Sequence, residues 1–294
     1  MGACPSSRLN ATPILTSIRC RDGHKWRREP VQDGKEVNLH DTARRYLRDL
    51  FGVDDSFTAL QHPAEALFLH VISVLHAPAY RDENRGALRL DWPRVPLPGA
   101  EDVLLTSAQL GRHIVALLNE DIPLPQVTAG PLRPDLKAIG LLATHDTGEG
   151  TDIDALLSIT ANWGYLSPGG ATMPAQGRAI GRDYTPDELA SIAEGAAVLG
   201  LTLHQALDSL GHETYDIYLN DVAYWRNVPT KVWEYTASGY QVIKKWLSYR
   251  ERAILRRPLT KNEARTITNM ARRVAALLLL GPALDANYES AKQT

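Results

Sequence analysis

The sequence predicts an α+β fold that is mostly helical, with a small antiparallel β-region in the middle and a C-terminal antiparallel helical hairpin. Apolar residues recur at helical spacing early and late in the chain, whereas short apolar runs separated by glycine and proline turns occupy residues 139–182. Two amphipathic segments joined by a short loop follow. A hydrophobic content of 44% and a charged content of 22% fit a globular protein with a packed core.

The first part of the chain divides into an irregular N-terminal stump over residues 1–36 and a helical segment with proline-rich connectors over residues 37–135. We expect one helix over residues 38–50 and a second, buried helix that begins at Pro63 and ends at Pro78. A Thr106-x-x-Gln109 pattern resembles a capping box and predicts a third helix that ends at Leu118.

Residues 136–294 form the predicted third part, in which a β-region precedes basic helices. Strands are expected at Ile139–Ala143 and Ala155–Thr160, and the loop Asn162–Arg178 is too long for a simple turn, as functional loops often are. Thr185, Pro186 and Glu188 form a capping box that predicts a helix to about Val198. A short helix over Leu203–Leu210 and a strand over Thr214–Leu219 should follow.

The helical hairpin is predicted from residues 240–256 and 261–280. Thr260 and Glu263 form a second capping box at the start of the later helix, and Gly281-Pro282 should end it. The apolar phase of the two helices predicts which side chains face inward. These are Val242, Ile243, Trp246, Ile267, Ala271 and Val274.

Positive charge is concentrated in the same region. Between Arg226 and Pro282, twelve Lys and Arg residues and three Glu residues give a net charge of +9, whereas the whole chain carries −2. A basic block in a near-neutral protein is typical of a surface that binds phosphate groups.

The helical phase of this block predicts a surface that contacts DNA. Arg265, Asn269, Arg272 and Arg273 should share one polar face, and the loops should supply side chains that read bases. An ordinary solvated helix face remains the alternative interpretation of the same pattern. The full set of candidate DNA contacts is Gln176, Arg178, Arg226, Asn227, Lys231, Lys244, Lys245, Arg252, Arg265, Asn269, Arg272 and Arg273.

Catalytic signatures are missing from the sequence. It contains no Pro-Pro dipeptide to form the base-holding motif of an amino-methyltransferase, no glycine-rich turn for the methyl donor, no G-x-x-x-x-G-K-[ST] loop and no H-E-x-x-H pair. Cys4 and Cys20 are too few for a thiolate zinc site, and the acidic residues beside His145 fit a solvated turn better than a metal site, so no metal is expected.

Membrane association is not predicted. The N-terminus lacks the pattern of a secretory signal, and the longest apolar run, Val274–Leu280, is far shorter than a membrane span. We therefore expect a cytoplasmic protein with no membrane partner.

Several long motifs resemble a known family. The stretch AEALFLHVISVLHAPAYRDENRGALRLDWPRVPLP is similar to a segment that follows the catalytic core of adenine-specific DNA methyltransferases. The stretch YDIYLNDVAYWRNVPTKVWEYTASGYQVIKKWLSYRERAILRRPLT resembles the C-terminal specificity domain of Type ISP restriction–modification enzymes. WGYLSPGGATMP and ARRVAALLLLGPALDANY extend the resemblance to roughly residues 38–288.

The resemblance implies sequence-specific recognition of double-stranded DNA within a restriction–modification system that defends against phages. It implies that the target adenine is presented to a methyltransferase domain that binds S-adenosylmethionine; this chain itself should hold no cofactor and have no activity alone. Methyltransferase, motor and nuclease domains are the implied partners, in the same or a separate polypeptide. A subunit of a split active methyltransferase, and a protein-docking module with little DNA affinity, remain alternatives.

Overall fold

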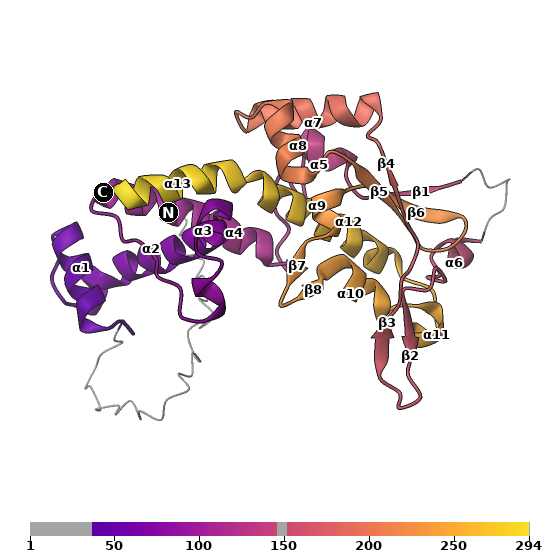
Figure 1. The fold of residues 1–294 in the computed structure, drawn as a ribbon, viewed down its shortest axis with the longest axis horizontal. Helices are drawn as coiled ribbons and strands as arrows, with labels where there is room; N and C mark the ends of the chain where they lie inside the picture. The colour runs from indigo at the N-terminus through magenta and orange to yellow at the C-terminus, as the bar shows by residue number, and fades with distance from the viewer. Residues whose placement is uncertain (1–36, 146–151, 294) are drawn as a thin grey trace, which may run out of the picture. The chain divides into compact units, whose positions relative to one another are not determined.

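The structure, a computed structural model, describes residues 37–145 and 152–293 (Figure 1). Helices predominate, and the strands form a four-stranded antiparallel sheet and two two-stranded hairpins, so the α+β prediction is confirmed. The predicted N-terminal stump, the two cysteines and the basic residues Lys25, Arg27 and Arg28 lie outside the described residues.

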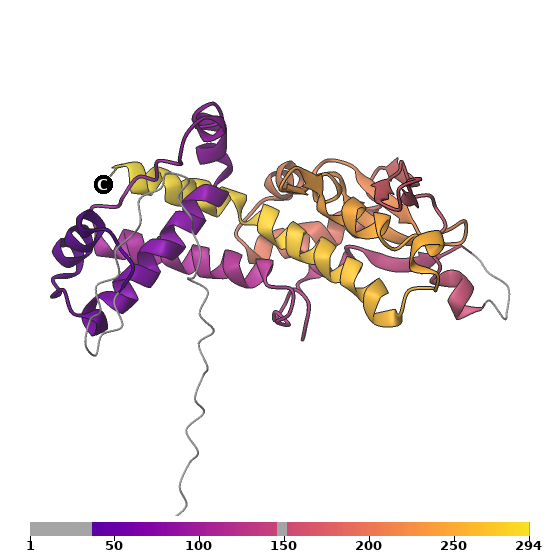
Figure 2. The same cartoon turned by 90° about the horizontal axis from the view of Figure 1, so that it is seen from below.

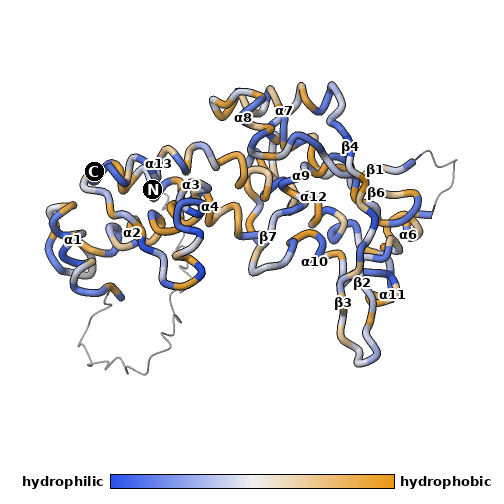
Figure 3. The backbone as a smooth tube through the Cα atoms, viewed as in Figure 1, coloured by the Kyte–Doolittle hydropathy of each residue, from blue (hydrophilic) through white to orange (hydrophobic). Residues whose placement is uncertain are grey.

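A cluster of helices occupies the first described part of the chain. Its members are α1 (Asp41–Phe51), α2 (Phe57–His76), α3 (Pro78–Glu83), η1 (Ala87–Arg89), α4 (Glu101–Leu118) and α13 (Gly281–Gln293). Helices α2 and α4 pack closely because Gly111 has no side chain; a Cβ there would overlap the Leu69 carbonyl. Figure 3 shows hydrophobic residues recurring along both helices. The predicted boundary between residues 135 and 136 stays a prediction.

Two helix starts in this cluster differ from the prediction. Helix α2 begins before Pro63, because the Ser56 hydroxyl caps it by accepting a hydrogen bond from the Ala59 N–H. Helix α4 begins at Glu101, so Thr106 and Gln109 lie inside it and form no capping box. The acidic first turn of Glu101 and Asp102 supplies the favourable interaction with the helix dipole instead.

The central sheet has the strand order β1-β6-β5-β4, with every neighbouring pair antiparallel. Its strands are β1 (Leu141–Thr144), β4 (Ala179–Arg182), β5 (Thr214–Tyr218) and β6 (Ala223–Pro229). Trp225 lies opposite Leu142 and Ile217 in the two neighbouring strands, and its ring is fully buried. The predicted strand at Ala155–Thr160 is wrong, because the Asp152 side chain caps the short helix α6 (Ile153–Leu156).

Helices α5 (Pro134–Ala138), α7 (Pro186–Val198) and α8 (Leu203–Leu210) pack beside one another along one end of this sheet. The capping box of Thr185 and Glu188 is confirmed, as is the short helix α8. Helix α9 (Thr230–Trp233) continues directly from β6. Two hairpins complete the β structure: β2 (Gly164–Leu166) with β3 (Thr172–Pro174), and β7 (Thr236–Ala237) with β8 (Tyr240–Gln241).

The C-terminal helices differ in part from the predicted hairpin. Its first arm is broken into α10 (Val242–Ser248) and α11 (Arg252–Leu255), which a turn at residues 249–251 separates. Helix α12 (Lys261–Leu279) packs on α10, and Ile243, Ile267 and Ala271 are buried as predicted, while Trp246 is half-buried. Helix α12 ends at Leu279, just before Gly281 and Pro282 as predicted, and a further helix that the sequence did not predict, α13, begins at Gly281 (Figure 2).

By length and composition, the α12–α13 stretch Lys261–Gln293 could cross a membrane. Most of its apolar window, 67%, is buried inside the protein, as is typical of the core helix of a globular domain.

The confirmed cap of α12 gives a pH-dependent prediction. Hydrogen bonds from Arg257 lower the pKa of Glu263 from the ordinary 4.5 to about 2, and the Thr260 backbone N–H adds to this effect. Because the folded-state pKa is depressed, the contribution of Glu263 to stability is present above about pH 4.5 and is lost as the pH falls towards about 2. Glu263→Gln should therefore cost about 1 kcal/mol near neutral pH and much less in acid, as measured by urea unfolding across pH. Glu194→Gln, at an exposed glutamate of α7, is the control; an equal cost at all pH values would contradict the prediction.

Candidate nucleic-acid interface

Arg273, one of the predicted DNA contacts, lies in the interior of the protein, with 8% of its surface exposed. Its guanidinium donates to the carbonyls of Ala116 and Leu117 at 2.9 and 3.2 Å, and also to that of Ile122. The first two belong to the last turn of α4, which has no basic residue of its own there. Arg273 therefore stabilises the negative end of the α4 dipole, and its expected exposure is wrong.

Arg272 and Asn227 are buried as well. Arg272, 9% exposed, donates to the Lys137 carbonyl at 3.3 Å in the last turn of α5, and burial lowers the pKa of its guanidinium. Asn227 has a left-handed backbone conformation with φ of 58° and bonds to Thr214 and to the Ala138 carbonyl. Burial removes both side chains from any surface that could read bases, so these two assignments are corrected too.

Arg226, Arg178 and Lys231 reach solvent but already have partners. Arg226 lies 3.5 Å from Glu188, whose carboxylate also binds Arg182. Arg178 pairs with Asp221 at 3.0 Å and stacks over the Tyr218 ring. Lys231 donates to the carbonyl of Asp208 at 2.6 Å, in the last turn of α8. A bound phosphate would have to compete with these partners for the three cations.

The remaining candidates are more accessible. Gln176, Lys245, Arg252 and Arg265 are exposed, and Lys244 and Asn269 are half-buried. Asn269 lines a cavity of about 590 Å³ whose wall also contains Glu120, Asp121 and Glu263. These three carboxylates outnumber the two guanidiniums of Arg250 and Arg273 in the same wall, so this cavity is a poor anion site.

Lys244 and Lys245 share a different hollow, of about 580 Å³, which we call the lysine–tyrosine groove. Its walls come from the β2–β3 hairpin, the β7–β8 hairpin and α10, and its described lining residues include no Asp or Glu. They are Thr172, Met173, Pro174, Thr236, Gly239, Tyr240, Gln241, Lys244, Lys245, Ser248 and Tyr249. The Lys245 ammonium lies 3.5 Å from the centre of the Tyr240 ring, so these two groove residues form a cation–π contact. Cations, amides and exposed rings without carboxylates suit a polyanion that also carries flat bases.

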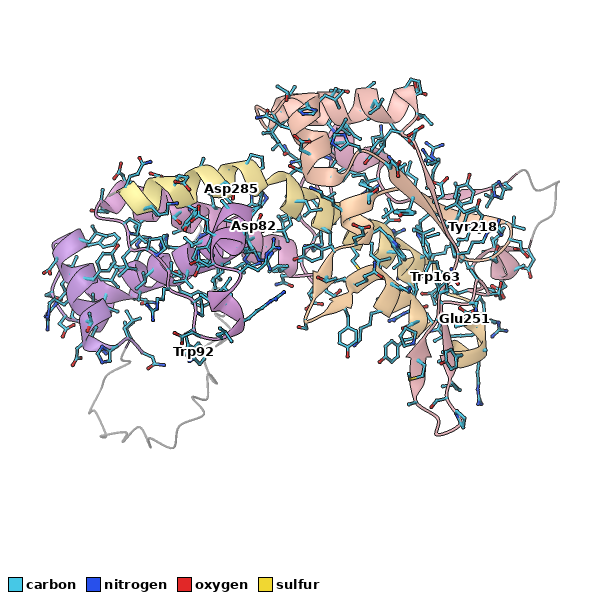
Figure 4. The ribbon with its side chains drawn as sticks, viewed as in Figure 1. Asp82, Trp92, Trp163, Tyr218, Glu251 and Asp285 are labelled. Carbon is cyan, nitrogen blue, oxygen red and sulfur yellow. The ribbon has the colours of Figure 1, made fainter. Side chains whose placement is uncertain are left out.

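The β2–β3 hairpin beside this groove has a fixed root. Trp163 is fully buried against Trp233, and its indole N–H donates to the Tyr218 carbonyl at 2.8 Å. Glu251 accepts from the backbone N–H groups of Asn162 and Trp163 at 3.3 and 2.8 Å. Figure 4 labels Trp163 and Glu251 at this root.

The Glu251 hydrogen bonds and two glycines hold this root in one geometry. Burial raises the pKa of Glu251, and the hydrogen bonds from the backbone oppose that shift because they favour the charged carboxylate. Gly164 packs against the Ser248 backbone, and Gly177 packs against the Trp163 ring. A Cβ at either glycine would overlap the group that it packs against. The hairpin therefore leaves the core along one fixed direction.

Tyr240, Gln241, Tyr249 and Met173 are the groove residues that sequence reasoning missed. The sequence indicates these residues only weakly. Residues 240–241 fit the predicted helix, and the β7–β8 hairpin over residues 236–241 is too short to show an alternation of apolar residues. Of the two aromatic residues at the start of the hairpin, Trp163 belongs to the core, whereas Tyr165 is exposed.

No cluster of three or more His, Cys, Asp or Glu side chains able to hold a metal ion occurs among residues 37–145 and 152–293. Asp146 and Glu149, part of the acidic turn beside His145, lie outside the described residues. His145 itself hydrogen-bonds to the Tyr218 hydroxyl at 3.1 Å and stacks near Tyr224.

Comparison with known protein families gives a match over most of the chain. Residues 19–277 match the family model of the Type ISP C-terminal specificity domain. The match spans the lysine–tyrosine groove, the central sheet and most of the helical cluster. No curated protein and no solved structure matches the chain significantly.

Proposed function

Because the chain belongs to the family of Type ISP C-terminal specificity domains, we propose that it reads a specific sequence in double-stranded DNA for an adenine-specific restriction–modification methyltransferase. The domain would select the site and place the target adenine before a methyltransferase domain. That neighbouring domain would bind S-adenosylmethionine, and this chain would contribute no catalytic group.

The observation that carries the proposal is the lysine–tyrosine groove. DNA-binding surfaces combine cations that contact phosphates with polar and aromatic side chains that contact bases. Lys244 and Lys245 supply the first kind, while Gln241, Tyr240 and Tyr249 supply the second. Arg252 and Arg265 are further exposed cations, on α11 and α12, and Arg265 lines a different hollow together with Lys261.

A specific observation favours one alternative, the protein-docking module. Leu90 and Trp92 are largely exposed on the connector between η1 and α4, and exposed apolar side chains of this size favour contact with another protein domain. We propose that this connector contacts a methyltransferase, motor or nuclease domain, in the same or a separate polypeptide, while the groove contacts DNA. A docking module that does not bind DNA would use the connector alone.

The expected result that tests the function is salt-dependent binding of the full chain to duplex DNA. Each phosphate contact contributes a slope of about −0.9 in log affinity against log salt, so replacing both groove lysines by alanine should flatten the slope by about two. Fluorescence anisotropy of a labelled mixed-sequence duplex across a salt series measures this, with Arg112→Ala on α4 as the control cation. Absence of duplex binding at low salt would reject the proposal in favour of the docking module. Methyl transfer from labelled S-adenosylmethionine by this chain alone would instead contradict the non-catalytic assignment.

A further inference from the structure

The β2–β3 hairpin is a narrow two-stranded ribbon that extends beyond the sheet (Figure 1). Tyr165 pairs with Met173 across it, and Leu166 pairs with Thr172. The tip is closed by hydrogen bonds from the Ser167 N–H to the Ala171 carbonyl at 2.9 Å and from the Gly170 N–H to the Ser167 carbonyl at 2.8 Å. A two-stranded antiparallel ribbon of this kind fits the major groove of B-form DNA.

The side chains of the hairpin are unusual for an exposed protrusion. Residues 162–177 contain no charged residue, and the exposed fractions of Tyr165, Leu166 and Met173 are 51, 46 and 41%. Hairpins that remain in solvent normally carry charged residues. A group of exposed apolar side chains instead favours contact with a partner. Among base edges, the thymine methyl group accepts apolar contacts, while hydroxyls and amides such as those of Thr172 and Gln176 hydrogen-bond to the other edges.

The flank of the hairpin lies beside positive charge, which the tip itself lacks. Thr172, Met173 and Pro174 line the lysine–tyrosine groove, and so do Lys244 and Lys245 of the neighbouring helix α10. The strand β3 therefore stands beside two cations with no carboxylate among the described lining residues. This arrangement complements a duplex, whose backbone phosphates border the groove that exposes its bases.

The fixed root makes the tip suitable for reading sequence. Discrimination between bases requires donors and apolar groups held to within a fraction of an ångström, and a loose loop would lose that selectivity. Trp163 and Glu251 fix the root, and α10 and α11 pack against β2 and β3. The rigid base thus connects the folded core directly to the uncharged tip.

We propose that the β2–β3 hairpin is the sequence-reading element of this domain: its tip enters the major groove while Lys244 and Lys245 hold the phosphate backbone beside it. This inference rests on the proposed DNA-recognition function and assigns it to a particular element. Specificity and affinity are then separable, because the tip chooses the site and the lysines strengthen binding to every duplex.

The experiment selects duplexes from a labelled library with a randomised core, using the full chain and four variants. The reading variant is Leu166→Ser with Met173→Ser, the phosphate variant is Lys244→Ala with Lys245→Ala, and the control is Leu90→Ser with Trp92→Ser on the connector. All six side chains reach solvent, and thermal unfolding of each variant checks that it is folded. Gln176→Ala provides a second reading variant that removes no apolar surface.

The reading variants should lose or change bases of the selected motif, and their preference for the selected over a scrambled duplex should fall about tenfold or more, the loss expected for one or two base contacts. Their binding to scrambled duplex should stay within about threefold of the parent. The phosphate variant should keep the motif and bind all duplexes more weakly, and the control should match the parent.

Failure of the inference and failure of the function have different signatures. If the parent selects a motif and both reading variants select the same motif with the same preference, the hairpin does not read DNA and its apolar tip contacts protein. If the parent binds no duplex, the DNA-recognition function itself is rejected, and this assignment with it.

Discussion

Replacing Arg273 by alanine is expected to destabilise the fold by about 3 kcal/mol or more, measured as a shift of the urea midpoint at constant slope. Three carbonyl oxygens lose a charged donor in a buried place, and each buried polar group left without a partner costs about 1–3 kcal/mol. The last turn of α4 also loses the cation that stabilises it. Arg273→Lys should recover part of the loss, because one ammonium cannot reach all three oxygens.

Two arginines of the same helix are matched controls. Arg265 is exposed, so Arg265→Ala should change stability by about 0.5 kcal/mol or less. Arg272 is buried with a single 3.3 Å hydrogen bond, and its Nε has no partner among the described residues, so Arg272→Met should cost little. Equal effects of Arg265→Ala and Arg273→Ala would contradict the structural role of Arg273.

Gly177→Ala is expected to cost on the order of 3 kcal/mol. The residue has a φ of +69°, where a Cβ adds about 1–2 kcal/mol of strain, and the same Cβ would overlap the buried Trp163 ring, which cannot move away without disturbing the core. Displacement of this ring would also shift the root of the β2–β3 hairpin. Urea unfolding measures the cost, and the quenching of tryptophan fluorescence reports exposure of the ring.

The hairpin tip contains the control for this substitution. Gly170 also has a positive φ, of +80°, but no atom lies within 4 Å of the position of its Cβ. Gly170→Ala should therefore cost only the conformational part, about 1 kcal/mol. If both substitutions cost the same, close packing of Trp163 against Gly177 contributes nothing measurable.

Features that depend on neighbouring residues were predictable from the sequence. The caps at Thr185 and Thr260 each need only a glutamate three residues later, so their helices were placed correctly. The Thr106–Gln109 pattern failed for the opposite reason: a helix that begins earlier at Glu101 makes the same spacing irrelevant. The α+β class also followed from local periodicity.

The helical phase of a sequence does not predict whether the polar face of a helix is buried as well as its apolar face. A helical wheel assumes one covered face, and this holds for the first half of α12, where Lys261 and Arg265 are exposed. The second half is covered on several sides by α4, α5 and the elements around them, so the face of Arg272 and Arg273 is buried as well. Contacts of this kind join residues more than a hundred positions apart and leave no local pattern.

The candidate interface was predicted in the same incomplete way. Lys244 and Lys245 followed from the concentration of charge, and the loop Asn162–Arg178 was singled out by its length. Tyr240, Tyr249 and Met173 meet those lysines only because the two hairpins and α10 fold together, and no spacing in the sequence indicates that meeting.

The position of α13 has a consequence for how the protein is made. Asn287 donates to Ser73 and Ser107, and Asp285 accepts from the Ala79 N–H, which joins residues 180 or more positions apart. During synthesis, α2 and α4 leave the ribosome long before α13 is translated. The surface of α2 and α4 that α13 covers therefore stays exposed while the central sheet is translated. Helices α2 and α4 are therefore expected to complete their packing only after α13 is made, so the appearance of α13 sets the moment at which the cluster closes.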